Sequence, residues 1–159
     1  MNIQLICVGK LKEAFYRDAA EEYLKRLTPY CRLTLTQLPE ERLPERPSPA
    51  QIEAALGKEA DAIRSKLPAG AGVVALCVEG RMRSSEELAG MLADWANSGG
   101  RPLAFVIGGS YGLHRSIKEQ AMLRLSMSPM TFPHHLARVM LLEQIYRAFK
   151  INEGSRYHK

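Results

Sequence analysis

The chain has 159 residues, of which 46% are hydrophobic and 25% are charged, and its net charge is +5. No apolar run approaches the ~20 residues that a membrane helix needs, and no secretion signal precedes the first strand. We therefore expect residues 1–159 to form one domain of a soluble, cytoplasmic protein. The positive charge favours a polyanionic partner such as RNA, although many basic proteins bind none.

The three cysteines, Cys7, Cys31 and Cys77, are far apart in the sequence. A disulfide framework or a zinc site calls for an even number of cysteines or for close pairs, and the sequence has neither. We expect free, buried thiols, which indicate a reducing compartment. The four histidines also lack a spacing that suits a metal ion, so no metal is expected.

The first elements follow from hydrophobic periodicity. Asn2–Gly9 is predicted to be a strand, and apolar residues three and four apart predict a helix over Lys12–Leu27, which Pro29 ends. Arg32–Leu38 alternates apolar and polar residues, which predicts a second strand. The charged, proline-rich Pro39–Pro47 must be a surface loop, either a connector or a mobile arm near the substrate.

Two further helices are predicted to begin at capping boxes, in which a serine and a residue three positions later satisfy each other's backbone N–H groups. The pairs are Ser48 with Gln51 and Ser84 with Glu87. The predicted buried stripe of the first helix is Ile52, Leu56, Ile63 and Leu67. The predicted core face of the second is Leu88, Leu92 and Trp95.

The segments Val73–Val78 and Pro102–Ile107 are apolar without alternation, which is the pattern of strands buried on both faces of a parallel sheet. Strands and helices alternate along the chain. The sequence therefore predicts an α/β fold with a mainly parallel sheet flanked by helices.

A glycine-rich segment, Gly108–Gly112, directly follows the second of these strands. Glycine at the carboxyl end of a parallel strand lets the backbone approach a ligand closely, but a plain turn explains the segment equally well. The segment matches neither the dinucleotide-binding GxGxxG pattern nor a phosphate-binding P-loop.

The segment Leu125–His134 (LSMSPMTFPH) combines two prolines with hydroxyl and apolar residues. It suits a structured loop better than a helix or a central strand. Its backbone can bind an adenine ring while Met130 and Phe132 cover that ring. The alternative is that these two side chains pack in the core.

His134–Lys150 is predicted to be the last helix, and its apolar residues cover more than one face. They are Leu136, Val139, Met140, Leu142, Ile145, Tyr146 and Phe149. Burial in the core on one side and at a subunit interface on the other accounts for this pattern, so the sequence indicates a dimer.

The segment Ile151–Lys159 ends in Arg156, Tyr157, His158 and Lys159. A frayed, solvated tail is the ordinary expectation for such a segment. The functional alternative is a basic, aromatic strip over a nucleotide. Tyrosine would then stack on a base, arginine and lysine would bind phosphate, and histidine would move a proton.

Three runs in this order, FVIGGSYGL, LSMSPMTFPHHLARVMLLEQIYRA and the terminal RYHK, resemble the ribosomal RNA large subunit methyltransferase H family, the smallest SPOUT-class (α/β-knot) methyltransferases. The resemblance covers the whole chain. It implies a C-terminal trefoil knot, which no sequence pattern alone suggests. It also implies a homodimer in which the tail of one subunit reaches the cofactor site of the other.

The same resemblance implies an enzyme that uses S-adenosylmethionine to methylate N3 of a pseudouridine in helix 69 of 23S ribosomal RNA, within assembled ribosomes. It assigns target recognition and catalysis to Arg147, Tyr157 and His158, with His158 as the candidate base. Arg138 and Glu143 match the family helix without a defined role. The implied cofactor contacts are Leu76, Gly109, Ser128, Pro129, Met130, Thr131, Phe132 and Pro133.

Arg156 departs from the family pattern, which often has proline before the terminal tyrosine and histidine. Two alternatives to the enzyme remain open on the sequence. A doubly wound nucleotide- or flavin-binding protein has the same alternation of elements, but the missing GxGxxG and the basic charge argue against it. A non-catalytic ribosome-binding protein with this fold would keep the charge and lose cofactor binding.

Overall fold

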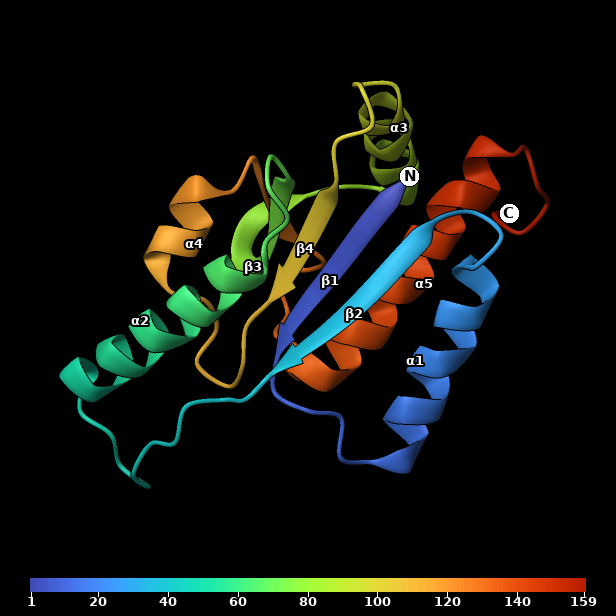
Figure 1. Ribbon diagram of the computed structural model, residues 1–159. Helices are drawn as coiled ribbons and strands as arrows, with labels where there is room; N and C mark the ends of the chain where they lie inside the picture. Colours follow the sequence, from blue (N-terminus) through green and yellow to red (C-terminus); the bar gives the residue numbers. More distant parts are fainter.

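The computed structural model describes residues 1–159 and alternates strands with helices along the whole chain (Figure 1). The strands are β1 (Asn2–Val8), β2 (Arg32–Leu38), β3 (Gly72–Met82), β4 (Leu103–Ile107) and β5 (Leu123–Ser126). The helices are α1 (Ala14–Leu27), α2 (Pro49–Lys66), α3 (Ser85–Ala96), α4 (Arg115–Gln120) and α5 (His134–Asn152). The predicted α/β class is thereby confirmed.

The five strands form one sheet in the order β2-β1-β4-β3-β5, and every neighbouring pair is parallel. β4 lies at the centre and all five of its residues are buried, as its continuous apolar sequence predicts. Because the strands are parallel, all of them end at the same edge of the sheet. The segments that follow the strands therefore meet at that edge.

Helices cover both faces of the sheet (Figure 1). On one face, α1, α3 and α5 pack on Ile3, Leu5 and Phe105. On the other face, α2 and α4 pack on Ile6 and Val106. Successive residues of β1 thus point to opposite layers, as the two-residue period of a strand requires.

Both predicted capping boxes are present. The Ser48 hydroxyl accepts a hydrogen bond from the Gln51 backbone N–H, and the Gln51 side chain accepts one from the Ser48 backbone N–H. Ser84 and Glu87 make the same reciprocal pair at the start of α3. Local side-chain chemistry therefore sets both helix starts.

The predicted buried stripe is correct for α3 and partly wrong for α2. In α3, Leu88 and Leu92 are buried and Trp95 is half-buried. Of the four residues predicted for α2, only Ile63 is fully buried. Ile52 and Leu56 lie in the N-terminal half of α2, which extends past the sheet (Figure 1), and Leu67 follows the last residue of the helix. The buried residues of α2 are Ala55, Glu59, Ala60 and Ile63.

The structure also corrects the prediction around β3 and β5. β3 runs to Met82 instead of ending at Val78, because its last residues pair with β5 beyond an irregularity in the register. β5 includes Leu125 and Ser126, which the sequence pattern assigns to a loop. Neither β5, with four residues, nor α4, with six, is long enough to show a periodic pattern.

Cys7 and Cys31 are buried, Cys77 is half-buried, and all three are free thiols. Burial raises the pKa of Cys7 to about 12, against the opposing effect of the nearby Arg138 charge. None of the helices has the length and apolar character that a bilayer crossing requires. The trefoil knot stays a prediction.

One buried arginine ties the last helix to the first two strands. The side chain of Arg138, on α5, is 0% exposed. It donates hydrogen bonds of 2.9 Å to Gln37 Oε1 and to the Gly9 carbonyl oxygen. Gln37 Oε1 also accepts from the Leu11 backbone N–H. Neutral oxygen atoms at the ends of β1 and β2 thus accept hydrogen bonds from Nη1 and Nη2 of the guanidinium, whereas its buried Nε has no hydrogen-bond partner.

Replacing this side chain is expected to destabilise the fold. Arg138→Ala leaves the buried Gly9 carbonyl oxygen without this donor, removes one of the two donors to Gln37 Oε1 and opens a cavity. Together these losses should lower the free energy of unfolding by about 2–4 kcal/mol. Chemical denaturation measures this loss. The control is Arg124→Ala at an exposed position, where a change under about 0.5 kcal/mol is expected. Equal effects of the two changes would contradict the role of Arg138.

Candidate functional site

A pocket of about 590 Å³ opens at the edge where the strands end. Three segments line it: the middle of β3, the glycine-rich loop after β4, and the segment that joins β5 to α5. We call it the strand-edge pocket. The sequence-predicted cofactor residues that line it are Leu76, Gly109, Ser128, Met130, Thr131, Phe132 and Pro133. Pro129 belongs to the same segment and is exposed, but it does not line the pocket.

The glycine-rich loop is both a turn and a wall of this pocket. A Cβ on Gly108 would lie 2.2 Å from the Gly112 carbonyl oxygen, and Gly112 itself has a φ of +79°. The Gly112 N–H donates back to the Gly109 carbonyl oxygen at 3.0 Å. Only glycine fits the first position without moving backbone, so the loop stays tight and its main chain faces the pocket.

A carboxylate that the sequence analysis did not single out holds this loop from behind. Glu40 Oε1 accepts a hydrogen bond of 2.6 Å from the Ser110 backbone N–H. Burial is the largest single effect and raises the pKa of Glu40, but hydrogen bonds from the backbone and the side chain of Ser110, together with the nearby His134 and His135, lower that pKa overall. Glu40 belongs to the loop that was predicted as either a connector or a mobile arm. Its position directly after a strand end was the available signal.

The C-terminal segment folds back instead of fraying. Gly154 has a φ of +72°, and the Ser155 N–H donates to the Lys150 carbonyl oxygen at 2.9 Å. This left-handed turn ends α5 and reverses the chain direction. The tail is visible as the loop beyond α5 in Figure 1.

The folded tail brings together the three residues predicted for catalysis. Glu143 Oε1 accepts hydrogen bonds from Arg147 Nη2 at 2.6 Å and from the Tyr157 hydroxyl at 3.2 Å. The Arg147 guanidinium lies 4.8 Å from the centre of the Tyr157 ring, a cation–π arrangement. His158 Nδ1 is 3.4 Å from Arg147 Nη1. We call Glu143, Arg147, Tyr157 and His158 the tail cluster.

The charges of the tail cluster perturb its members. Partial burial and then the Glu143 carboxylate raise the pKa of Tyr157, so its hydroxyl stays a hydrogen-bond donor. The hydrogen bond with Glu143 also raises the pKa of Arg147. Arg156 is exposed and outside the cluster. Glu79, on β3, forms an ion pair with Lys118 and is not part of the cluster.

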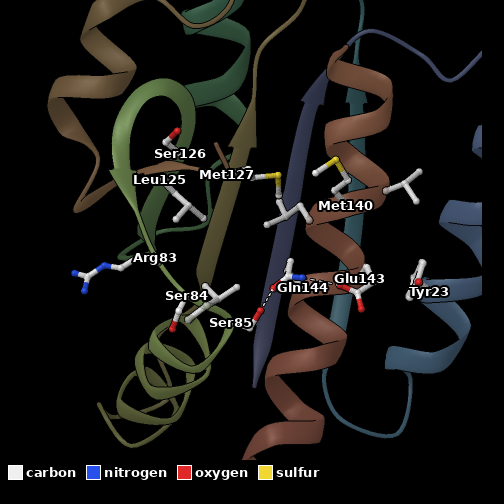
Figure 2. A pocket seen from close by; sticks show the side chains of 13 residues that line it. Tyr23, Arg83, Ser84, Ser85, Leu125, Ser126, Met127, Met140, Glu143 and Gln144 are labelled. Atoms are coloured by element: carbon white, nitrogen blue, oxygen red, sulfur yellow. Dashed lines mark hydrogen bonds between the residues drawn. The ribbon is translucent and has the colours of Figure 1, made fainter. Parts of the chain in front are cut away.

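A second hollow of about 600 Å³ lies between α3 and α5, with Tyr23 of α1 at one side (Figure 2). At one point Ser85 Oγ of α3 donates to Gln144 Oε1 of α5 at 2.7 Å. We call this hollow the α3–α5 groove. It shares Leu125–Met127 with the strand-edge pocket and includes Glu143 of the tail cluster.

Within one chain, the tail cluster and the strand-edge pocket are separate. Neither Arg147, Tyr157 nor His158 lines that pocket. The structure therefore gathers the predicted cofactor residues in one place and the predicted catalytic residues in another. No three His, Cys, Asp or Glu side chains are grouped so that they could hold a metal ion.

These features define an α/β protein with a glycine-walled ligand pocket at the carboxyl edge of a parallel sheet. Residues 1–158 match the family described as "Predicted SPOUT methyltransferase". The chain belongs to the SPOUT methyltransferase family, as the motifs in the sequence indicated.

Curated relatives match the chain over its whole length. It is 48% identical to ribosomal RNA large subunit methyltransferase H of Moorella thermoacetica, over 100% of this chain and 99% of the relative. It is also 48% identical to the protein of that name from Bifidobacterium animalis subsp. lactis, with 100% of both chains covered. The protein of that name from Streptococcus equi subsp. zooepidemicus is 46% identical, again over 100% of both chains.

Solved structures of more distant proteins share the fold. A probable methyltransferase from Bordetella pertussis Tohama I superposes with a TM-score of 0.55 at 17% identity, over 92% of this chain and 95% of the other. A probable methylase family protein from Haemophilus influenzae Rd KW20 gives 0.54 at 14% identity, over 99% and 70%. At such low identities the likeness concerns the fold alone.

The tight glycine loop generates a prediction. Gly108→Ala should lower the midpoint of thermal unfolding by about 4–8 °C, because a loss of ~2 kcal/mol follows from the clash with backbone. Gly90→Ala on α3 is the matched control, since nothing lies within 4 Å of a Cβ added there. Alanine should leave that helix unchanged or more stable. If both variants melted alike, the loop would not require glycine.

Proposed function

We propose that this chain transfers a methyl group from S-adenosylmethionine to N3 of a pseudouridine in helix 69 of 23S ribosomal RNA within assembled ribosomes. The name shared by relatives at 46–48% identity supports a ribosomal RNA substrate. The observation that carries the proposal is the strand-edge pocket, where seven of the eight expected cofactor residues meet. Residues 1–159 would act as one domain in the cytoplasm, where ribosomes are.

The residues of the strand-edge pocket suit this cofactor. Its volume of about 590 Å³ lies within the range of small-molecule sites. Leu76, Met130 and Phe132 offer apolar cover for an adenine ring, and the loop at Gly109 brings backbone close to polar atoms. When bound, S-adenosylmethionine supplies an electrophilic methyl group on a positively charged sulfur.

The tail cluster suits the nucleotide. The Tyr157 ring can stack on the base, and Arg147 can bind a phosphate or a carbonyl oxygen. N3 of the target carries a proton, and His158 is the proposed acceptor of that proton. Alignment of N3 with the methyl group supplies much of the catalysis, since positioning is worth ~7–11 kcal/mol in favourable cases.

We propose that a homodimer brings the tail cluster and the strand-edge pocket together. Val139 and Met140 of α5, both half-buried, line the α3–α5 groove, and Met140 is labelled in Figure 2. A second copy would bury them, as the two-sided apolar pattern of α5 predicts. The tail of one subunit then completes the cofactor site of its partner.

The first experiment measures transfer of labelled methyl groups from S-adenosylmethionine to ribosomes that lack the modification, followed by mass mapping of the 23S RNA. Label at a helix-69 pseudouridine is expected. His158→Ala should lower kcat by about 10²–10⁴-fold, because a general base contributes that much, while cofactor affinity stays the same.

The matched control is His114→Ala, since His114 pairs with Glu53 away from the tail and its loss should leave kcat unchanged. Cofactor binding without any label on the RNA would redirect the search to another nucleic acid. Full activity of His158→Ala would remove this residue as the base. Equal turnover of a short helix-69 oligonucleotide would remove the need for the ribosome.

Mixed dimers test whether the tail acts on the partner. One subunit carries His158→Ala, and the other carries Thr131→Arg, which fills the strand-edge pocket from an exposed position. Either homodimer should be inactive. The purified heterodimer has one intact pocket facing one intact tail, so it should recover about half of the wild-type rate per dimer. A heterodimer as inactive as its parents would show that each tail serves its own subunit.

A further inference from the structure

His158 has a second partner, which the proposed function does not use. Its Nε2 atom lies 2.7 Å from Oε1 of Glu86, in the first turn of α3. The other ring nitrogen, Nδ1, lies 3.4 Å from Arg147 Nη1. A guanidinium can only donate hydrogen bonds, so a neutral imidazole here carries its lone pair on Nδ1 and its proton on Nε2, facing the carboxylate.

The neighbouring residues Glu86 and Glu87, in the first turn of α3, have different hydrogen-bond partners. Glu87 completes the capping box with Ser84 and pairs with Arg83 at 3.0 Å. Glu86 is not needed for the cap, and its side-chain partner outside the turn is His158, 72 residues away. A hydrogen bond from the Ser84 hydroxyl, followed by a backbone N–H and by His158, lowers the pKa of Glu86 to about 2. The carboxylate is therefore ionised at any working pH.

We propose that Glu86 is a positioning residue for His158. Its carboxylate holds the imidazole as the Nε2–H tautomer and leaves Nδ1 as the atom that accepts a proton. The contact with the Arg147 donor is long, at 3.4 Å, so it is compatible with a lone pair on Nδ1 and only weakly occupies that lone pair. This arrangement of carboxylate, imidazole and reacting group is the one by which enzymes orient a histidine base. The inference rests on the proposed function for the identity of the proton donor.

The proton transfer explains why the charge of Glu86 matters. The N3–H bond of the target breaks and its proton passes to Nδ1, while the N3 electron pair bonds to the methyl carbon. The bond between that carbon and the donor's sulfur breaks, and its electron pair stays on sulfur. The resulting imidazolium lies next to the Arg147 cation, whose charge Glu143 balances at 2.6 Å. Glu86 balances the new positive charge.

Kinetic measurements with the full chain and unmodified ribosomes distinguish two contributions of Glu86, its negative charge and its role as hydrogen-bond acceptor for His158. Glu86→Gln keeps an oxygen acceptor for Nε2–H but removes the charge, so kcat should fall about 10-fold while KM stays within about 2-fold. Glu86→Ala loses the acceptor too and should be slower still. Glu87→Gln keeps the capping box and removes a charge in the same turn, so it should match the wild type. Glu86→Ala combined with His158→Ala should be no slower than His158→Ala alone.

A spectroscopic measurement needs no activity. Long-range ¹H–¹⁵N spectra of the imidazole should show His158 as the Nε2–H tautomer in the wild type and in Glu87→Gln, and as a mixture in Glu86→Ala. The same mixture in the wild type, or wild-type kcat in Glu86→Ala, would overturn the proposal. A protein that shows the Nε2–H tautomer but does not methylate ribosomes would refute the proposed function and leave the positioning contact standing.

Discussion

The buried guanidinium of Arg138 is the interaction on which the site depends. A charge without a carboxylate partner is costly inside a protein, yet here the Gly9 carbonyl and the Gln37 amide oxygen accept its hydrogen bonds. These oxygens mark where β1 and β2 finish, so the start of α5 is held against the edge where the strands end. His134 and Ala137, on the same turns of α5, then form part of the pocket wall. The stability of the fold and the shape of the pocket therefore share one contact.

The α/β class could be predicted because its signals are local. Continuous apolar runs identified the central strands, and the hydroxyls of Ser48 and Ser84 identified two helix starts. The predictions that were wrong concerned features that depend on tertiary packing. The stripe of α2 depends on how far the sheet reaches beneath it, and β5 is too short to show a period. Burial of Arg138 was also invisible, since the residue looks like a surface charge in the sequence.

The candidate site divides in the same way. Spacing alone left the glycine loop, the segment before α5 and the tail each with a structural alternative, and the family resemblance selected residues among them. The structure then gathered those residues into the strand-edge pocket and the tail cluster. The sequence analysis did not identify Glu40 and Glu86 as site residues, because their hydrogen-bond partners lie 70 and 72 residues away in the sequence. Glu86 in particular looks like an ordinary member of a capping turn, and only the folded tail gives it a partner.

The left-handed turn at Gly154 limits how far the C-terminal tail can extend from the end of α5. Four residues, 155–158, lead from the turn to the imidazole, and an extended residue spans at most ~3.6 Å, so the Cα of His158 stays within about 14 Å of the Cα of Gly154. A group on so short a tether has a high local concentration inside that sphere and none outside it. The length of the tail therefore limits which pocket His158 can reach. The imidazole can act only in a pocket that lies within this distance of the Gly154 turn.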